Sequence, residues 1–224
     1  MELPLGEKIA PVNNIGLPQR QLYQGRVVRL SPLDPVADGP GLYACSHGSR
    51  EQEAVWAYLN YGPFADQQAM GAWLETCAVQ TDPLFFTVRT LAPDEPVGMV
   101  SFLALSPADR CLELGHIWYG SQVQRTKVNT ETIYLMLCQA FDQLHYRRVE
   151  WKCNALNEKS RAAALRLGFQ YEGLFRQHRI VKGRNRDTAW YALLDGDWPN
   201  VKAHMERWLY GTEESLSLRQ LNGG

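Results

Sequence analysis

The sequence predicts a single domain of mixed α/β class. Residues 129–145 carry apolar side chains at three- and four-residue steps, as a helix does, and residues 149–153 alternate apolar and charged side chains, as a half-buried strand does. A strand, a covering helix and a second strand most easily form a parallel pair. Earlier, three strand-like runs at residues 84–89, 97–105 and 111–119 are separated by turn-forming stretches, which favours an antiparallel meander.

Composition limits the functions that this domain can have. The chain has 224 residues, 45% of them hydrophobic, which is enough for one substantial core. Its 23 basic and 24 acidic side chains give a net charge of -1, without a dense run of Lys or Arg. We therefore expect no nucleic-acid partner and no binding to an anionic membrane surface.

The cysteines and the N-terminus indicate a reducing compartment. Five cysteines are odd in number and include no Cys-x-x-Cys pair, so neither a disulfide framework nor a zinc site is indicated. The first residues lack a basic region followed by an apolar core, and no stretch approaches the roughly 18 apolar residues of a membrane span. We expect a cytoplasmic protein without a bound metal.

The first half of the chain begins with an arm. Residues 1–25 contain proline, glycine and asparagine without periodicity, which predicts an extended segment. Residues 26–30 predict a strand, and residues 35–45 predict a helix that opens with a proline. A second helix lies within residues 66–82, where apolar side chains recur at helical spacing.

The second half alternates helix and strand. Asn157 is a good N-cap for a helix of about three turns, which Gly168 ends. Residues 169–194 predict a hairpin with its turn at 182–185, and residues 198–210 predict a last helix. We therefore expect three segments: an extended arm at residues 1–25, one domain at 26–210 and a frayed tail at 211–224.

The most informative stretch is residues 124–131, Gln-Arg-Thr-Lys-Val-Asn-Thr-Glu, at the start of the most secure helix. At a helix N-terminus, the free backbone amides and the positive end of the helix dipole point in the same direction. A loop that leads from a strand into such a helix therefore makes an anion site. We expect a phosphorylated ligand there. An ordinary strand-to-helix turn without a ligand is the alternative.

Four motifs together resemble the GCN5-related N-acetyltransferase (GNAT) superfamily, in its RimJ/RimL-like branch. They are Leu-Glu-Leu-Gly-His-Ile-Trp at 112–118, the loop at 124–131, Asn-Glu-Lys-Ser-Arg at 157–161 with Gly168-Phe169, and Arg-Asp-Thr at 186–188. The resemblance covers roughly residues 26–198. It implies a mixed sheet of about seven strands, splayed between the fourth and fifth strands, with helices on both faces. It also implies acetyl-CoA in the opening and transfer of the acetyl group to an amine.

The resemblance implies which residues hold acetyl-CoA. Similar proteins carry glycines where Thr126 and Val128 stand here, and glycine lets a backbone approach phosphate without a Cβ. The Thr126 hydroxyl and the charges of Arg125 and Lys127 are the expected compensation. Asn157 corresponds to an asparagine that holds the pantetheine arm, although an N-cap asparagine is also common in helices. The expected cofactor-binding residues are Ile117, Trp118, Gln124, Arg125, Thr126, Lys127, Val128, Asn129, Thr130, Asn157 and Ser160.

Transfer from a thioester needs a neutral amine, so a base or a water chain must remove a proton. Glu113, on the strand expected to floor the cleft, is our first candidate base, and His116 is the second. In a regular strand Glu113 shares a face with Gly115 and Ile117, whereas His116 points to the other face. A bulge would break this parity. His116 as an ordinary core residue is the alternative. The backbone N–H of Ile117 or Trp118 can polarise the thioester carbonyl.

The departing thiolate needs a hydrogen-bond donor. Many similar proteins have a tyrosine where this chain has Ala164. Ser160 lies one turn earlier on the same helix face and is our candidate partner for the sulfur. A serine hydroxyl is a poor acid, so we expect it to stabilise the thiolate rather than to transfer a proton fully.

Three other groups have structural alternatives. The aromatic residues between the first two helices either fill the core or wall the acceptor pocket; they are Trp56, Tyr58, Tyr61, Phe64 and Trp73. Glu131, in the first turn of its helix, interacts favourably with the helix dipole and needs no catalytic role. Arg186 and Asp187 are expected to form an ion pair or a turn contact.

We therefore interpret the chain as an N-acetyltransferase that works by direct transfer in a ternary complex, with a protein N-terminus or a small-molecule amine as acceptor. Because Thr126, Val128 and Ala164 depart from the pattern, a non-catalytic acyl-CoA-binding or regulatory module is the alternative. A nucleotide-phosphate enzyme is less favoured, since neither phosphate-binding glycine motif is present. A covalent cysteine route is disfavoured because three cysteines fall on apolar elements. The acceptor and the oligomeric state stay open, a homodimer included.

Overall fold

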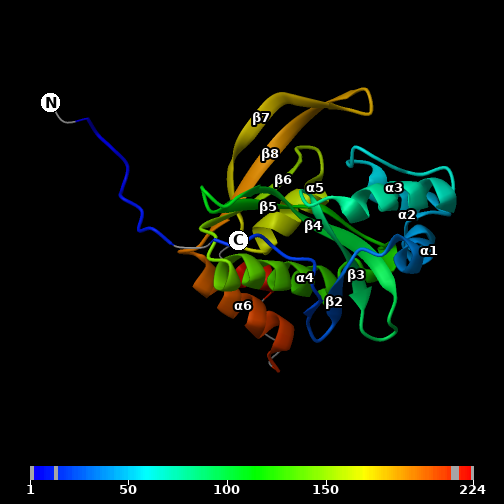
Figure 1. Ribbon diagram of the computed structural model, residues 1–224, viewed down its shortest axis with the longest axis horizontal. Helices are drawn as coiled ribbons and strands as arrows, with labels where there is room; N and C mark the ends of the chain where they lie inside the picture. The colour runs from blue at the N-terminus through cyan, green and yellow to red at the C-terminus, as the bar shows by residue number, and fades with distance from the viewer. Residues whose placement is uncertain (1–2, 13–14, 213–216, 223–224) are drawn as a thin grey trace.

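The computed structural model describes residues 3–12, 15–212 and 217–222, which form one mixed sheet (Figure 1). Its order is β1-β2-β3-β4-β5-β6-β8-β7. The strands are β1 Tyr23–Gln24, β2 Val28–Pro32, β3 Leu84–Thr90, β4 Pro96–Ser106, β5 Cys111–Tyr119, β6 Arg148–Asn154, β7 Gln170–Val181 and β8 Arg184–Leu194. The predicted mixed α/β class is confirmed. The described residues form eight strands rather than about seven, because the end of the expected arm pairs with β2 as β1.

A parallel pair joins the two halves of the sheet. β1 to β5 run antiparallel, as the meander predicts, and so do β6, β8 and β7. β5 and β6 are parallel, and they are connected by the short helix η2 (Ser121–Val123), by α4 (Lys127–Leu137) and by the π-helical turn η3 (Cys138–Gln143). Two parallel neighbours need a connection that returns the chain to the same end of the sheet, and α4 lies in that connection. The predicted crossover is confirmed.

One face of the sheet, here called the α1 face, is covered by the first helices. These are α1 (Pro35–Ser46), α2 (Arg50–Glu53), η1 (Ala54–Trp56) and α3 (Gln67–Val79). Leu42 of α1 and Leu74 of α3 are fully buried against Phe85, Met99 and Trp118 of the sheet. Asp34 begins α1 by accepting hydrogen bonds from two backbone N–H groups of its first turn, as an N-cap does.

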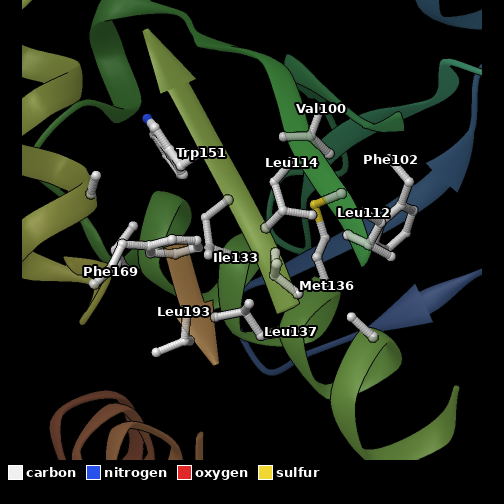
Figure 2. Close-up of a cluster of buried hydrophobic side chains, with 14 of the residues drawn as sticks. Val100, Phe102, Leu112, Leu114, Ile133, Met136, Leu137, Trp151, Phe169 and Leu193 are labelled. Carbon is white, nitrogen blue, oxygen red and sulfur yellow. The ribbon is translucent and has the colours of Figure 1, made fainter. Parts of the chain in front are cut away.

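The opposite face, here called the α4 face, is covered by α4, α5 (Glu158–Arg166) and α6 (Trp198–Tyr210). Figure 2 shows side chains of α4 packed against side chains of β5 and β6, among them Ile133, Met136, Leu112, Leu114 and Trp151. Each large apolar side chain that is buried in this way contributes roughly 1.5–3 kcal/mol. This packing fixes α4 on the sheet and therefore fixes where its N-terminus lies.

Glu131 has a structural role larger than the expected interaction with the helix dipole. Its carboxylate is fully buried. It accepts hydrogen bonds from the backbone N–H groups of Arg26 (2.9 Å), Val27 (2.6 Å) and Val28 (2.7 Å), and from the hydroxyl of Tyr210 (2.8 Å). One side chain of α4 thus holds the start of β2 and the end of α6 in place.

The C-terminal segment packs on the domain, in contrast to the frayed tail that we expected. α7 (Leu218–Leu221) begins with a capping box at Ser217, and Leu218 is buried in the core. The Asn222 side-chain amide donates to the carbonyl oxygen of Arg166 (2.9 Å). Residues 213–216 and 223–224 of the tail lie outside the described residues. At the other end, residues 3–12 run away from the domain (Figure 1).

Three observations concern membrane spans, metal sites and disulfides. Within the described part of the chain, no helix is long and apolar enough to cross a membrane. No three His, Cys, Asp or Glu side chains of the same residues are grouped as they would be around a metal ion. The five cysteines are free thiols.

Candidate active site

The sheet opens between β5 and β6. Their pairing begins at Cys111 and Arg148 and ends at Leu114 and Trp151, although β5 continues to Tyr119. β6 remains paired with β8 up to its last residue. β5 therefore has no partner on its β6 side beyond Leu114 in the described structure. The predicted splay is confirmed, and it lies between the fourth and fifth strands when the two-residue β1 is left out of the count. Residues 115–119 thus have no strand partner along one edge.

A β-bulge at His116 decides which side chains face the opening. β4 pairs Ser101 with Gly115 but Met99 with Trp118, so β5 holds one extra residue there. His116 has φ 53°, in the left-handed region. As a result Leu114 is buried on the α4 face and Trp118 on the α1 face, although a regular strand would put both on the same face.

The bulge brings Glu113 and His116 to the same face. Glu113 points away from the α4 face, on which its neighbours in β5 are buried. The His116 ring stacks on Tyr61 (5.6 Å between centroids) and lies 4.8 Å from the ring of Phe85, both on the α1 side. The regular alternation of side chains, which would put the two candidate bases on opposite faces of β5, therefore holds only up to Gly115.

Glu113 belongs to a buried charged network that the sequence analysis did not identify. Its carboxylate lies 3.0 Å from Nζ of Lys152, which also lies 2.8 Å from the carboxylate of Glu150. The Lys152 ammonium sits 3.9 Å from the centre of the Trp190 ring. Burial raises the pKa of Glu113, and the charge of Lys152 offsets this only in part. The sequence signal for this network was the alternation of Glu150 and Lys152 with apolar residues in one strand.

His116 is a neutral, hydrogen-bonded side chain. Its Nδ1 lies 2.9 Å from the hydroxyl of Tyr61. Burial lowers the pKa of His116 to about 4, so the imidazole carries no charge at pH 7. Both interpretations given to it, candidate base and core residue, are compatible with these surroundings.

The loop between β5 and α4 is held by its own side chains. The Gln124 amide donates to the carbonyl oxygen of Tyr119 (3.1 Å). Thr126 is the N-cap of α4: its hydroxyl accepts from the Val128 N–H (3.2 Å) and donates to the Val123 carbonyl oxygen (2.7 Å). Arg125 is exposed, with φ 64°. Four amides of a first helical turn lack intrahelical partners, and Thr126 satisfies one of them.

Of the next loop positions, Val128 and Thr130 are buried, whereas Lys127 is exposed. Val128 is 3% exposed and packs in the core of the α4 face, so its side chain does not fill the loop. Lys127 donates from Nζ to the carbonyl oxygen of Leu209 (2.5 Å), at the end of α6. Thr130 is fully buried and accepts from Arg166 (2.8 Å).

Asn129 carries an unused acceptor. Its Oδ1 is buried and has no hydrogen-bond partner among the described residues. A buried acceptor without a donor is costly, and a ligand donor at the α4 N-terminus would satisfy it. The first-turn amides are the feature of the loop that fits a diphosphate, because phosphate oxygens accept hydrogen bonds, whereas Asn129 Oδ1 needs a donor from another part of a ligand.

Asn157 and Ser160 form the opposite wall of the opening. The Asn157 side chain caps α5 by accepting from the Ser160 N–H (3.1 Å), as the sequence predicts. The Ser160 hydroxyl accepts from the indole N–H of Trp151 (3.0 Å), and it is also hydrogen-bonded to the thiol of Cys153. Ala164 is fully buried one turn later.

The aromatic segment between α2 and α3 is core at its centre and exposed at its edge. Trp56 is fully buried, whereas Tyr61, Phe64 and Trp73 are partly buried around it. Tyr58 is 37% exposed, and its hydroxyl donates to the carbonyl oxygen of Leu156, beyond the end of β6. The segment therefore extends from the α1 layer to the wall that carries Asn157.

Arg186 and Asp187 do not pair with each other in the described structure. The Asp187 carboxylate accepts from the backbone N–H of Gln177 (2.7 Å) and from the side chain of Asn185 (3.0 Å), which is the predicted turn contact. Arg186 is the neighbouring residue in β8, so its side chain leaves the strand on the other face.

Comparison with known proteins identifies this architecture. Residues 28–170, more than half of the chain, match the family model described as an acetyltransferase (GNAT) domain. A GCN5-related N-acetyltransferase from Brucella melitensis is 37% identical and superimposes with a TM-score of 0.87, covering 92% of this chain and 96% of that one. The chain belongs to the GNAT acetyltransferase family.

Other similar proteins agree with this assignment. A probable GNAT acetyltransferase structure from Chromobacterium violaceum is 36% identical, with a TM-score of 0.81 over 88% of this chain and 98% of that one. The putative ribosomal N-acetyltransferase YdaF of Bacillus subtilis is 32% identical over 105 residues, 47% of this chain. The ribosomal-protein-serine acetyltransferase of Escherichia coli is 27% identical over 45% of this chain. The alignments span 57% and 56% of these two relatives, whose names support the RimJ/RimL-like branch.

Proposed function

We propose that this GNAT protein transfers the acetyl group of acetyl-CoA to a primary amine by direct attack within a ternary complex. The observation that carries the proposal is the opening between β5 and β6, with the N-terminus of α4 at its end. The unpaired edge of β5 offers backbone groups to an elongated carrier, and the first turn of α4 offers amides to its diphosphate.

The loop of residues 124–130 is the proposed diphosphate site. Arg125 contributes charge from an exposed side chain, and the first-turn amides of α4 contribute hydrogen bonds. The side chain of Lys127 is held by the end of α6, so we assign binding to its backbone amide instead. Gln124 and Thr130 support the loop and the helix, and Asn157 holds the pantetheine arm from the other wall.

Glu113 is the proposed base. Burial raises the pKa of Glu113, which makes its carboxylate a better proton acceptor. His116 remains the second candidate, because a group with a pKa of about 4 is a weaker base at pH 7. The carboxylate accepts the proton of the attacking amine, while the N–H of Ile117 or Trp118 polarises the carbonyl of the thioester that acetyl-CoA supplies.

Ser160 is the proposed partner of the departing sulfur. Its oxygen accepts from Trp151, and its hydrogen turns from the Cys153 thiol to the departing sulfur when CoA is bound. Catalysis through a covalent cysteine is disfavoured, because burial raises the pKa of Cys111 to about 11 and that of Cys138 to about 12. Such thiols stay protonated at pH 7 and are poor nucleophiles.

The proposed acceptor is a protein N-terminus or a small-molecule amine. Relatives named as ribosomal acetyltransferases support a protein N-terminus as the acceptor. The location is a separate point: the five free cysteines support a cytoplasmic one. The competing function is a non-catalytic acyl-CoA-binding module. The contact between Glu113 and Lys152 favours it, because a base that is held by a cation is less ready to accept a proton.

Binding and turnover separate these functions. Calorimetric titration with CoA should give saturable binding, and acetyl-CoA should be consumed in the presence of at least one amine from a panel of peptides and small amines. Tight binding without turnover on any acceptor would favour the module. Binding of ATP or NAD in preference to CoA would contradict both and favour a nucleotide enzyme.

A further inference from the structure

The acceptor side of the opening continues onto a polar surface of β6 and β8. Alternate residues of these strands, among them Trp151, Cys153, Ala189 and Tyr191, are buried on the α4 face. The residues between them face the other way: Lys152 pairs with Trp190, and Asn154 pairs with Thr188, across β6 and β8. Arg186 follows on the same face of β8, two residues before Thr188. We call Glu113, Lys152, Trp190, Thr188 and Arg186 the acceptor face.

A hairpin and the aromatic segment wall the acceptor face. The β7-β8 hairpin rises from the sheet and bends towards α3 (Figure 1). At its tip Lys182 donates from Nζ to the carbonyl oxygen of Trp56 (2.8 Å). Tyr58, from the same segment, donates to Leu156 (3.1 Å). Residues far apart in sequence thus surround the side from which an acceptor would approach Glu113.

Arg186 is a cation without a partner on this face. Among the described residues it makes no hydrogen bond or ion pair, and its Nε is buried and unsatisfied. Lys152 is different, because two carboxylates neutralise it. The indole N–H of Trp190 is a second buried donor on the acceptor face that has no partner in the described part of the chain. Buried donors without acceptors cost free energy that a bound anion would restore.

A like charge lies directly opposite Arg186. The register of β7 and β8 pairs it with Arg179, which is exposed. Like charges that face each other across two strands destabilise the pair, and the pKa of Arg186 is lowered by burial and by the charge of Arg179. An anion bound at Arg186 offsets this repulsion. Burial raises the pKa of Glu113, and the charge of Arg186 offsets a small part of this rise, so the two groups share one site.

We propose that Arg186 binds a carboxylate of the acceptor, so that this enzyme acetylates amines that carry a carboxylate close to the reacting nitrogen. The proposal rests on the proposed function, because it assigns the acceptor of the same site. The planar guanidinium can hold a carboxylate through two parallel hydrogen bonds, which fixes the orientation of the amine. Glu113 then removes a proton from an amine that Arg186 has positioned.

The test compares acceptors in matched pairs. Free amino acids are offered beside their carboxamides, and blocked peptides that begin with Asp are offered beside those that begin with Asn. The wild type should prefer the carboxylate member at least about tenfold in kcat/KM, as a charge-assisted bidentate contact predicts. Preference in the first pair identifies an α-carboxylate, and preference in the second identifies an acidic side chain.

Three variants connect this preference to Arg186. Arg186→Gln should raise KM for the carboxylate member and reduce the preference to about onefold, and Arg186→Lys should restore part of it. Arg176→Gln is the matched control, because Arg176 lies on the same hairpin beside Asp187, away from the acceptor face. A wild type without charge preference, or a preference that survives in Arg186→Gln, would overturn the proposal.

A binding measurement separates this proposal from the proposed function. Acetylated products of each pair are titrated calorimetrically into the CoA-bound protein, which requires no turnover. Selective binding of the carboxylate product without any turnover would support the Arg186 site and contradict the transferase. Turnover without charge preference would support the transferase and contradict the Arg186 site. If the protein showed neither turnover nor selective binding of the carboxylate product, both proposals would be overturned.

Discussion

Replacement of Glu113 by glutamine distinguishes a base from a structural ion pair. The change keeps the size of the side chain and removes its charge. Lys152 does not become an isolated buried cation, because the Glu150 carboxylate remains 2.8 Å from its Nζ. The glutamine carbonyl oxygen can also still accept a hydrogen bond from Lys152. We therefore expect the variant to fold, with a loss of unfolding free energy of about 1 kcal/mol or less.

The catalytic effect should be much larger than the effect on stability. Loss of a general base typically lowers turnover about 10²- to 10⁴-fold, which corresponds to roughly 3–5 kcal/mol of activation free energy. CoA affinity should stay within about twofold, because the proposed diphosphate site lies at the other end of the opening. The assay is steady-state turnover of acetyl-CoA together with calorimetric titration of CoA.

The pH profile gives a second readout. Turnover requires the ionised carboxylate, so kcat/KM should fall as the pH drops through the pKa of Glu113, which burial raises above its usual range. This acid limb should disappear in Glu113→Gln.

Glu150→Gln is the matched control, because it removes the other carboxylate that contacts Lys152. Equal losses of turnover in both variants, or wild-type turnover in Glu113→Gln, would refute the assignment of Glu113 as the base.

Four other variants test the loop and its support. Arg125→Ala should weaken CoA binding roughly three- to tenfold with little change in kcat, because an exposed side chain supplies only charge; an unchanged dissociation constant in calorimetry would contradict its role. Thr126→Ala should lower the unfolding free energy by about 1 kcal/mol in urea titration, since the Val128 N–H loses its cap; an unchanged midpoint would argue against the cap. Glu131→Gln should lower it by about 3 kcal/mol and Tyr210→Phe by about 1 kcal/mol, because the first affects four donors and the second removes one; similar losses in both would show that the backbone contacts contribute little.

Much of the fold could be predicted because its signals are local. The helical period of residues 129–145 and the alternation of residues 149–153 predicted α4 and β6, and the turn at 182–185 predicted the β7-β8 hairpin. The N-cap role of Asn157 also follows from its neighbours in sequence, because a cap bonds to amides two or three residues ahead.

The candidate site depends on contacts that no local pattern contains. The bulge at His116 changes the side-chain parity of β5, yet its residues alternate without a visible break. The contact of Glu113 with Lys152 joins two strands whose register is set by the crossover. The carboxylate of Glu131 binds backbone amides more than a hundred residues away in sequence. Such partners are fixed by packing, so sequence periodicity cannot identify them.

The sequence by itself determined the fold class, the crossover and the loop that begins α4, because hydrophobic period, turn residues and capping act over a few residues. Only the tertiary structure decided which charged groups meet. It placed Glu113 and His116 on one face, gave Lys152 two carboxylates and, among the described residues, gave Arg186 none. The physical reason is that electrostatic and hydrogen-bond partners depend on distance in space, which the sheet and its helices set only after the chain has folded.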